Sequence, residues 1–247
     1  MKIRMMKTSI LFFTLSIALF ALSGKEIIAR VDGNQVYNSI EYHATMTISM
    51  GKQVREKSFE GYAQGDEQAY MEFTAPAREK GTRFLKLADE MWMYIPSVEK
   101  ATKIAGHMLR QSLMGSDFSY DDFTENKKML DAYDIEVLDS DTFLGTECYV
   151  LELTAKIEEV SYYKRRLWVS KENYIPLKTE LFAKSGKLMK ELKVLEVKKI
   201  GTRHYPVHIR MENKLRKDTF TELIFEEIKI DVPIPEKVFT KAFIERK

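Results

Sequence analysis

Cysteine is almost absent from this chain, because its 247 residues include only one, Cys148. A single cysteine cannot form an internal disulfide, so a folded domain must be stabilised by a hydrophobic core. Cys148 lies in a short apolar run that continues to Leu151. We therefore expect its thiol to be a small buried hydrophobic group.

An excess of charge of either sign is also missing. The chain has 39 Lys and Arg residues against 37 Asp and Glu residues, for a formal net charge of +2. Nucleic acids and anionic membrane surfaces select strongly basic proteins. The near-neutral balance thus argues against nucleic acid as the main partner and against purely electrostatic attachment to lipid.

Long apolar runs are missing except at the N-terminus. There a short basic stretch precedes an apolar one: Lys2, Arg4 and Lys7, then Ile10–Leu22. The run is shorter than the roughly 20 residues that a bilayer-spanning helix needs. With Ala21-Leu22-Ser23 as a cleavage site, residues 1–23 are predicted to be a secretory signal peptide. Cleavage would leave Gly24 or the next residue first. Since no cysteine follows the site, we expect an exported, soluble protein without a lipid anchor.

Alternating apolar and polar residues dominate the remainder of the chain and predict antiparallel strands. About eleven are expected, bounded by Gly, Asp and Pro turns. They begin with Ile40–Ile48 and end with Thr219–Ile230. Helices are predicted at Lys25–Tyr37, with Ile27, Ile28, Val31 and Val36 near one face, and at Val238–Glu245.

The only long internal stretch without strand character is about Ile104–Asp131. A large sheet must curl or be covered to bury its apolar face. The expected fold is therefore mainly β: an incomplete antiparallel barrel with a helical lid and a short N-terminal helix. No internal repeat or long linker divides the chain, so residues 24–247 are predicted to form one domain.

Residues that could support metal binding or catalysis do not form recognisable sets. His204 and His208 have metal-like spacing, but Pro206 between them excludes a regular helix, and a strand would hold them roughly 13 Å apart. The serines near His107 and Asp117 lack the G-x-S-x-G pattern of a hydrolase. We predict neither a metal, a cofactor nor an enzymatic activity. The basic run Lys164–Arg166 is expected to lie on a solvated face.

Methionine and other large apolar side chains recur at alternate positions on successive predicted strands: Met46/Ile48, Met71/Phe73, Leu85/Leu87 and Met91/Met93/Ile95. Such residues can form an ordinary core or line an adaptable cavity, since methionine suits surfaces that accept varied ligands. The residues alone leave both possibilities open.

Three segments resemble the outer-membrane lipoprotein-sorting (LolA-like) proteins of diderm bacteria: Gly81–Leu85, Met91–Pro96 and Met114–Asp122, the last with the sequence MGSDFSYDD. The resemblance extends with less specificity over about Glu26–Phe243. It implies an incomplete antiparallel barrel capped by helices, which encloses a hydrophobic cavity for acyl chains. It also implies a carrier of lipids or lipoproteins across the periplasm, although the cargo does not transfer with the fold.

The predicted function is a monomeric periplasmic carrier that binds acyl chains non-covalently and moves them towards the outer membrane, between membrane-bound donor and acceptor proteins. The alternative is an adaptor of an export or efflux complex that binds a partner segment in the same groove. The predicted lipid-binding residues are Met46, Ile48, Met71, Phe73, Leu85, Leu87, Met91, Met93, Ile95, Met108, Leu113, Met114 and Phe118. Trp92 and Tyr94 are expected to pack under the lid, and Gly115, Ser116 and Asp117 to form its structural latch.

Overall fold

The computed structural model describes residues 22–35, 37–124 and 128–246, so the predicted leader up to residue 21 lies outside the described residues. Thirteen antiparallel strands form one sheet. They are β1 (Ile40–Met50), β2 (Gln53–Gln64), β3 (Gln68–Ala75), β4 (Arg83–Leu87), β5 (Glu90–Ile95), β6 (Lys100–Ile104), β7 (Tyr133–Phe143), β8 (Thr146–Ala155), β9 (Lys164–Ser170), β10 (Pro176–Phe182), β11 (Leu188–Ile200), β12 (Arg203–Asn213) and β13 (Thr219–Ile230).

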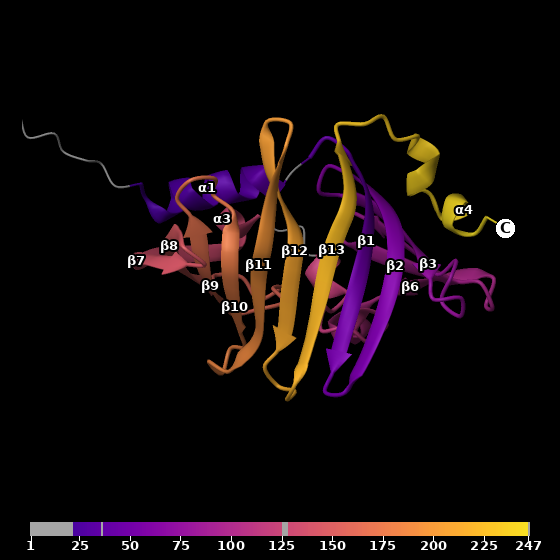
Figure 1. Cartoon of the computed structure of the whole chain (residues 1–247), viewed down its shortest axis with the longest axis horizontal. Helices are drawn as coiled ribbons and strands as arrows, with labels where there is room; N and C mark the ends of the chain where they lie inside the picture. The colour runs from indigo at the N-terminus through magenta and orange to yellow at the C-terminus, as the bar shows by residue number, and fades with distance from the viewer. Residues whose placement is uncertain (1–21, 36, 125–127, 247) are drawn as a thin grey trace, which may run out of the picture.

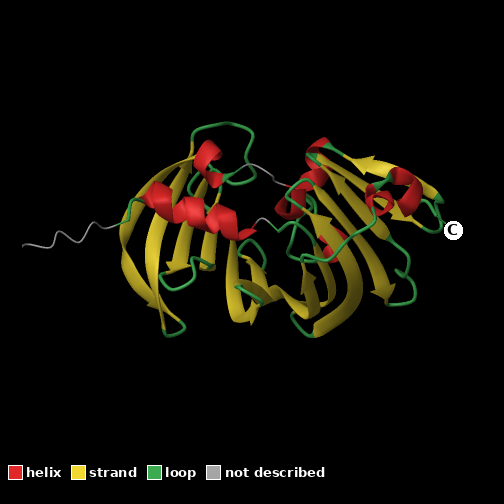
Figure 2. Ribbon diagram, turned by 90° about the horizontal axis from the view of Figure 1, so that it is seen from above, coloured by secondary structure: helices red, strands yellow, loops and turns green. Residues whose placement is uncertain are grey.

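The sheet is strongly curved but does not close (Figures 1 and 2). Its order is β6-β5-β4-β3-β2-β1-β13-β12-β11-β10-β9-β8-β7, so β1 pairs with β13 and the edge strands are β6 and β7. These two edge strands follow each other in the chain. The connection between them, residues 105–132, therefore joins opposite edges of the sheet. This arrangement confirms the predicted mainly-β, incomplete antiparallel barrel.

Strand β6 carries no alternating apolar pattern that would predict it from the sequence. Ala101 and Ile104 are buried, whereas Lys100 and Lys103 are exposed. Only two apolar residues mark the strand, separated by exposed side chains. Its pairing with β5, which joins Met91 to Ile104, identifies it as a strand.

The N-terminal helix α1 (Gly24–Gln35) covers the β7–β9 side of the sheet, as expected, and runs across its strands in Figure 1. Ser23 and Glu26 form a capping box: the Ser23 hydroxyl accepts from the Glu26 N–H at 3.3 Å, and the Glu26 carboxylate accepts from the Ser23 N–H at 2.8 Å. Ile27, Ile28 and Val31 are fully buried. They pack on Leu151, Leu153, Leu167 and Val169 of β8 and β9. Val36 lies outside the described residues.

The C-terminal residues cover the opposite, convex face near β3–β6. Two short helices form here, η3 (Glu236–Phe239) and α4 (Lys241–Ile244), where the sequence predicted one. Thr240 separates them because its backbone is extended, and its hydroxyl caps α4 by accepting from the Phe243 N–H at 3.2 Å. The Arg83 guanidinium holds the segment by donating to the Ile244 carbonyl at 2.9 Å.

This C-terminal cover corrects four sequence predictions. Trp92 and Tyr94 pack under Val238, Phe239 and Ile244, and the Lys241 ammonium lies 3.4 Å from the Trp92 ring centroid. They are not under residues 104–131. Leu85 and Leu87 belong to the same cluster, so they point away from the concave face that they were predicted to line. The reason is register: Leu85 pairs with Trp92, which places both on one face.

Cys148 is fully buried and free, as predicted, and burial raises the pKa of its thiol. Among residues 22–35, 37–124 and 128–246, no helix combines the length and apolar character required to cross a membrane.

Candidate functional site

The connection between β6 and β7 folds over the concave face as a series of short helical turns. These are η1 (Gly106–Arg110), η2 (Leu113–Gly115), α2 (Asp121–Thr124) and α3 (Met129–Ala132). Leu113, Phe118 and Tyr120 pack against the strands in one core cluster. We call residues 105–124 the bridging segment. It corresponds to the predicted lid, although the turns are shorter than that prediction implied.

In the predicted latch, Gly115-Ser116-Asp117, the last two residues are buried and Gly115 is exposed, and Asp117 bonds to β13. Asp117 accepts hydrogen bonds from the hydroxyls of Thr221 at 2.8 Å and Thr219 at 3.1 Å, while its own N–H donates to the Thr221 hydroxyl at 2.9 Å. Gly115 has a φ of +83°, which favours glycine. The bonds made by the Asp117 carboxyl therefore reach a strand about a hundred residues away in the chain.

A buried lysine from β2 holds the same loop. The Lys57 ammonium donates to the Met114 carbonyl at 2.8 Å and lies 2.6 Å from the Glu79 carboxylate. Only 5% of its side chain is exposed. A buried cation needs a paired charge and further hydrogen bonds. Lys57 thus ties the bridging segment to the β3–β4 connection.

A third anchor, Asp122, joins the bridging segment to the other half of the sheet. Its carboxylate accepts from the Lys190 ammonium, the Tyr162 hydroxyl and the Ser119 N–H, each at 2.7 Å. Burial, reinforced by the charge of Asp122, raises the pKa of Tyr162. The bridging segment is therefore fixed to β13 and β2 on one side and to β11 on the other.

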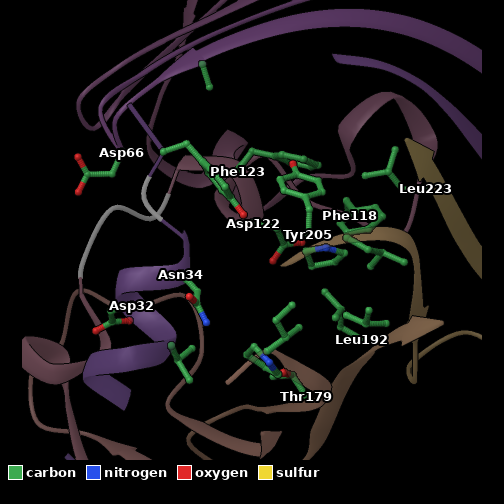
Figure 3. A pocket seen from close by; sticks show the side chains of 18 of the residues that line it. Asp32, Asn34, Asp66, Phe118, Asp122, Phe123, Thr179, Leu192, Tyr205 and Leu223 are labelled. Carbon is green, nitrogen blue, oxygen red and sulfur yellow. The ribbon is translucent and has the colours of Figure 1, made fainter. Parts of the chain in front are cut away.

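Between the sheet, α1 and the bridging segment lies a cavity of about 620 Å³ (Figure 3). Its size falls within the range typical of small-molecule sites. In Figure 3, Asp32, Asn34 and Asp66 lie on one side of the view, and Phe118, Leu192 and Leu223 on the other. The central lining is aromatic and aliphatic: Ile40, Tyr42, Phe59, Phe118, Phe123, Leu167, Ile175, Leu181, Leu192, Val194, Tyr205, Ile209, Met211, Leu223 and Phe225.

Five lining rings form a continuous row across β1, β2, β12 and β13. The centroids of Tyr37 and Tyr205 are 5.4 Å apart, those of Tyr205 and Phe225 5.5 Å, and those of Phe225 and Tyr42 5.4 Å. Tyr42 then contacts Phe59, with centroids 6.2 Å apart. The Tyr37–Tyr205 contact is tilted at 53° and the other three are edge-to-face, and such aromatic contacts are favourable and restrict ring orientation. The row gives the cavity a rigid wall.

The predicted lipid-binding residues occupy several different places. Phe118 lines the cavity. A larger group is packed in the core between the strands and the bridging segment: Met46, Ile48, Met71, Phe73 and Met91 from the strands and Leu113 from the segment, with Met93 and Met114 against them. Ile95 is half-buried, and Met108 is 37% exposed on η1. Contact between these residues and a ligand remains a prediction.

The cavity lining contains Met129 and Met211 but is mainly aromatic and aliphatic, and Met46, Met71 and Met91 lie in the core instead. One further expectation needs correction. Arg165 lines the cavity and donates to the Tyr133 hydroxyl at 2.9 Å, although its run was expected on a solvated face. Its neighbours Lys164 and Arg166 instead pair with Glu152 on the other face, because alternation separates them.

The serines that prompted a hydrolase alternative make local structural bonds. Ser112 donates to the Ser116 carbonyl, and Ser116 donates to the Phe118 carbonyl at 3.3 Å. The Ser119 hydroxyl accepts from Lys190 at 3.2 Å. In the part of the chain that the structure describes, no group of three or more His, Cys, Asp or Glu side chains is placed to hold a metal ion.

Gly61 makes room for Tyr42 in the cavity wall, because the two residues are cross-strand partners. A Cβ at Gly61 would collide with the tip of the Tyr42 ring and lie 2.8 Å from the Tyr70 carbonyl oxygen. Gly61→Ala is therefore expected to lower the free energy of unfolding by about 1–3 kcal/mol, as overpacking does. Urea denaturation measures this change. Gly33→Ala, in α1 with open space around it, is the matched control and should be neutral or stabilising. Equal stability of the two variants would contradict this packing.

A family model described as "-like: Uncharacterized protein" matches residues 65–246. No curated protein matches the chain. A crystal structure of a DUF1329 family protein from Desulfovibrio piger is 25% identical, with a TM-score of 0.83 over 90% of this chain and 97% of that one.

Two other solved structures support the same fold. A putative outer membrane lipoprotein-sorting protein domain from Vibrio parahaemolyticus is 23% identical, with a TM-score of 0.81 over 90% of this chain and 98% of that one. A LolA superfamily protein from Nitrosomonas europaea is 24% identical, with a TM-score of 0.75 over 90% of this chain and all of the other. The chain therefore has the LolA-like fold predicted from its sequence and belongs to the family whose model, described as "-like: Uncharacterized protein", spans residues 65–246.

Proposed function

We propose that this protein is a non-enzymatic carrier that binds an acyl chain of a lipid or lipoprotein in the cavity beneath the bridging segment. The observation that carries this proposal is the cavity itself, about 620 Å³ with a lining that is largely aromatic and aliphatic. The fold relationship to a protein named for lipoprotein sorting supports the same conclusion. The carrier acts in the periplasm as a monomer and moves its cargo towards the outer membrane, between membrane-bound donor and acceptor proteins.

The energetics of acyl-chain burial fit a reversible carrier. Each buried methylene contributes about 0.8 kcal/mol, so a chain of about 15 carbons supplies roughly 12 kcal/mol at most. The cost of immobilising the ligand reduces that figure. The anchors at Asp117, Lys57 and Asp122 hold the roof of the cavity with polar bonds that can break and re-form, while Leu113, Phe118 and Tyr120 of the same segment pack in the core.

A charge placed in the cavity should abolish lipid binding. Ile209 of β12 is half-buried and lines the cavity. Ile209→Glu would place a carboxylate in an apolar site at a cost of several kcal/mol. We expect binding of a fluorescent fatty acid to fall by at least tenfold, measured by titration with the fold checked by circular dichroism. Ile224→Glu, at an exposed position of β13, is the matched control and should bind normally.

Mass spectrometry of lipids that co-purify from the native host provides an independent test. Acyl lipid should accompany the wild type and be depleted in the Ile209→Glu variant. If Ile209→Glu and Ile224→Glu bound the fluorescent fatty acid equally well, the ligand site would lie outside this cavity. A co-purified peptide in place of lipid would favour the adaptor of an export complex.

Export without a lipid anchor also belongs to this proposal. The motivation is the predicted signal peptide, which lacks a following cysteine. Intact-mass analysis of the native protein should show an unmodified chain that begins near Gly24. A diacylglyceryl adduct or a retained leader would contradict this expectation. Because Ser23 caps α1, cleavage at either predicted site removes this cap and should weaken the first helical turn by about 1 kcal/mol.

A further inference from the structure

Two tyrosine hydroxyls in the cavity make no hydrogen bond to the described residues. Tyr42 and Tyr205 both line it, and neither hydroxyl has a hydrogen-bond partner within residues 22–35, 37–124 and 128–246. Other tyrosine hydroxyls inside the fold are engaged, since Tyr133 donates to the Tyr162 carbonyl and Tyr162 donates to Asp122. The two cavity phenols therefore differ from their counterparts in the anchors.

The orientation of these phenols is set by their neighbours. Tyr42 is held edge-on between Phe225, at 80°, and Phe59, at 87°, with its ring tip over Gly61. Tyr205 meets Phe225 at 88°. Each ring is thus constrained by packing, and its hydroxyl does not determine its position. The third phenol of the row, Tyr37, lies next to Tyr205 and also lines the cavity.

Burial keeps these groups in their donor form. It raises the pKa of both Tyr42 and Tyr205, and for Tyr205 the neighbouring phenols of Tyr37 and Tyr42 act in the same direction. Both side chains are half-buried, so their hydroxyls are not sealed from solvent. A donor that faces a ligand-sized cavity without a protein partner is available to an acceptor on the ligand.

The surroundings of the phenols favour an uncharged acceptor. The ring contacts of Tyr42 are Phe59 and Phe225, those of Tyr205 are Tyr37 and Phe225, and lining residues include Ile40, Ile209 and Leu223. The Arg203 guanidinium lies at the far end of the row, 4.4 Å from the Tyr37 ring centroid. Desolvating a carboxylate or phosphate in such surroundings would cost more than one or two phenol hydrogen bonds return. A carbonyl oxygen accepts the same bonds without that cost.

We propose that Tyr42 and Tyr205, with Tyr37 beside them, form a hydrogen-bond donor subsite for the ester carbonyl of an acyl chain bound in the cavity. This inference rests on the proposed function and narrows its ligand class: the cargo is an acyl ester, not a free fatty acid or a hydrocarbon. The aromatic row contacts the acyl chain of the ligand, and the tyrosine hydroxyls determine how deep in the cavity its ester group lies.

The test compares two glycerol lipids that differ only in the carbonyl, monopalmitoylglycerol (an ester) and monohexadecylglycerol (an ether), each measured by displacement of a fluorescent probe. The wild type should bind the ester about threefold to tenfold more tightly, the range expected for one or two neutral hydrogen bonds. In the double variant Tyr42→Phe/Tyr205→Phe, this preference should disappear while ether binding stays unchanged. Tyr62→Phe, on the convex side against Tyr70, is the matched control and should keep the preference.

A stability measurement separates this role from a structural one. Since the hydroxyls lack protein partners, the double variant should melt at the same temperature as the wild type or higher, whereas removal of a structural hydrogen bond would lower the melting temperature. Equal wild-type binding of ester and ether, or a preference that survives in the double variant, would overturn the subsite and leave the carrier intact. Failure of both lipids to bind the wild type would remove the carrier function itself. If palmitate bound more tightly than the ester, the preferred ligand would carry a charged carboxylate. That result would also contradict the proposed ester subsite.

Discussion

Replacement of Asp117 by alanine is expected to destabilise the protein by about 2–4 kcal/mol and to release the bridging segment. The side chain accepts from two threonine hydroxyls of β13, and Thr221 has no solvent-exposed surface. Alanine would leave the Thr221 hydroxyl without its acceptor in a buried position, where a lost hydrogen bond costs the full desolvation penalty. Asp117 ties the loop to β13 at the centre of the sheet. The substitution should therefore weaken the bridging segment in particular, in addition to lowering the stability of the whole protein.

Hydrogen exchange resolved by mass spectrometry checks this expectation. Amides of residues 105–124 should exchange at least tenfold faster in Asp117→Ala, while those of β8 and β9 should change only as far as global stability does. Asp117→Asn keeps one acceptor oxygen and should lose about half as much stability. Ser116→Ala removes only the bond to the Phe118 carbonyl and is the neighbouring control, with an expected loss below about 1.5 kcal/mol. Uniform exchange across the chain in Asp117→Ala would exclude a latch role.

Replacement of Lys57 by methionine is expected to cost about 3 kcal/mol, although methionine fills a similar volume. The substitution leaves the Glu79 carboxylate, of which 11% is exposed, with only the surface residue Arg78 at 3.1 Å. It also removes the donor to the Met114 carbonyl. Breaking a buried ion pair by removing one partner typically costs about 3–5 kcal/mol, and the remaining Arg78 contact favours the lower end. Denaturant unfolding of Lys57→Met measures the loss.

The effect of Lys57 should depend on pH in a defined direction. Burial opposes ionisation of Glu79, but the hydrogen bond and charge of Lys57, helped by Arg78, hold the pKa of Glu79 below its ordinary value of 4.5. A carboxyl with a lowered pKa in the folded state stabilises the protein above its unfolded pKa and loses that contribution as pH falls. The stability difference between wild type and Lys57→Met should therefore be largest above pH 4.5 and shrink below it.

An exposed ion pair supplies the control for Lys57. Lys103 pairs with Glu90 at 2.5 Å, with both side chains more than 40% exposed. Lys103→Met should cost at most about 1 kcal/mol, because solvent screens such pairs. Adding Glu79→Gln to Lys57→Met should recover part of the lost stability, since it removes the unpaired charge. A pH-independent difference between wild type and Lys57→Met would mean that Lys57 acts through packing alone.

Local patterns in the sequence determined most of the elements. Alternation predicted the strands from Ile40 to Ile230, and a helical stripe predicted the buried face of α1 at Ile27, Ile28 and Val31. Burial of Cys148 followed from its apolar neighbours. These features depend on residues within a few positions of one another, where side-chain period and turn chemistry act directly. The resemblance carried by residues 81–122 extended this local information to the fold.

The tertiary structure alone decided which side of each strand meets the cavity. A period of two defines two faces but does not say which is concave, so Leu85 and Leu87 were assigned to the wrong one. The strand order, with β1 beside β13 and the chain crossing from β6 to β7, also depends on contacts far apart in sequence. The row from Tyr37 to Phe225 and the bonds of Asp117 to Thr221 exist only because that order brings chain segments about a hundred residues or more apart onto one concave surface.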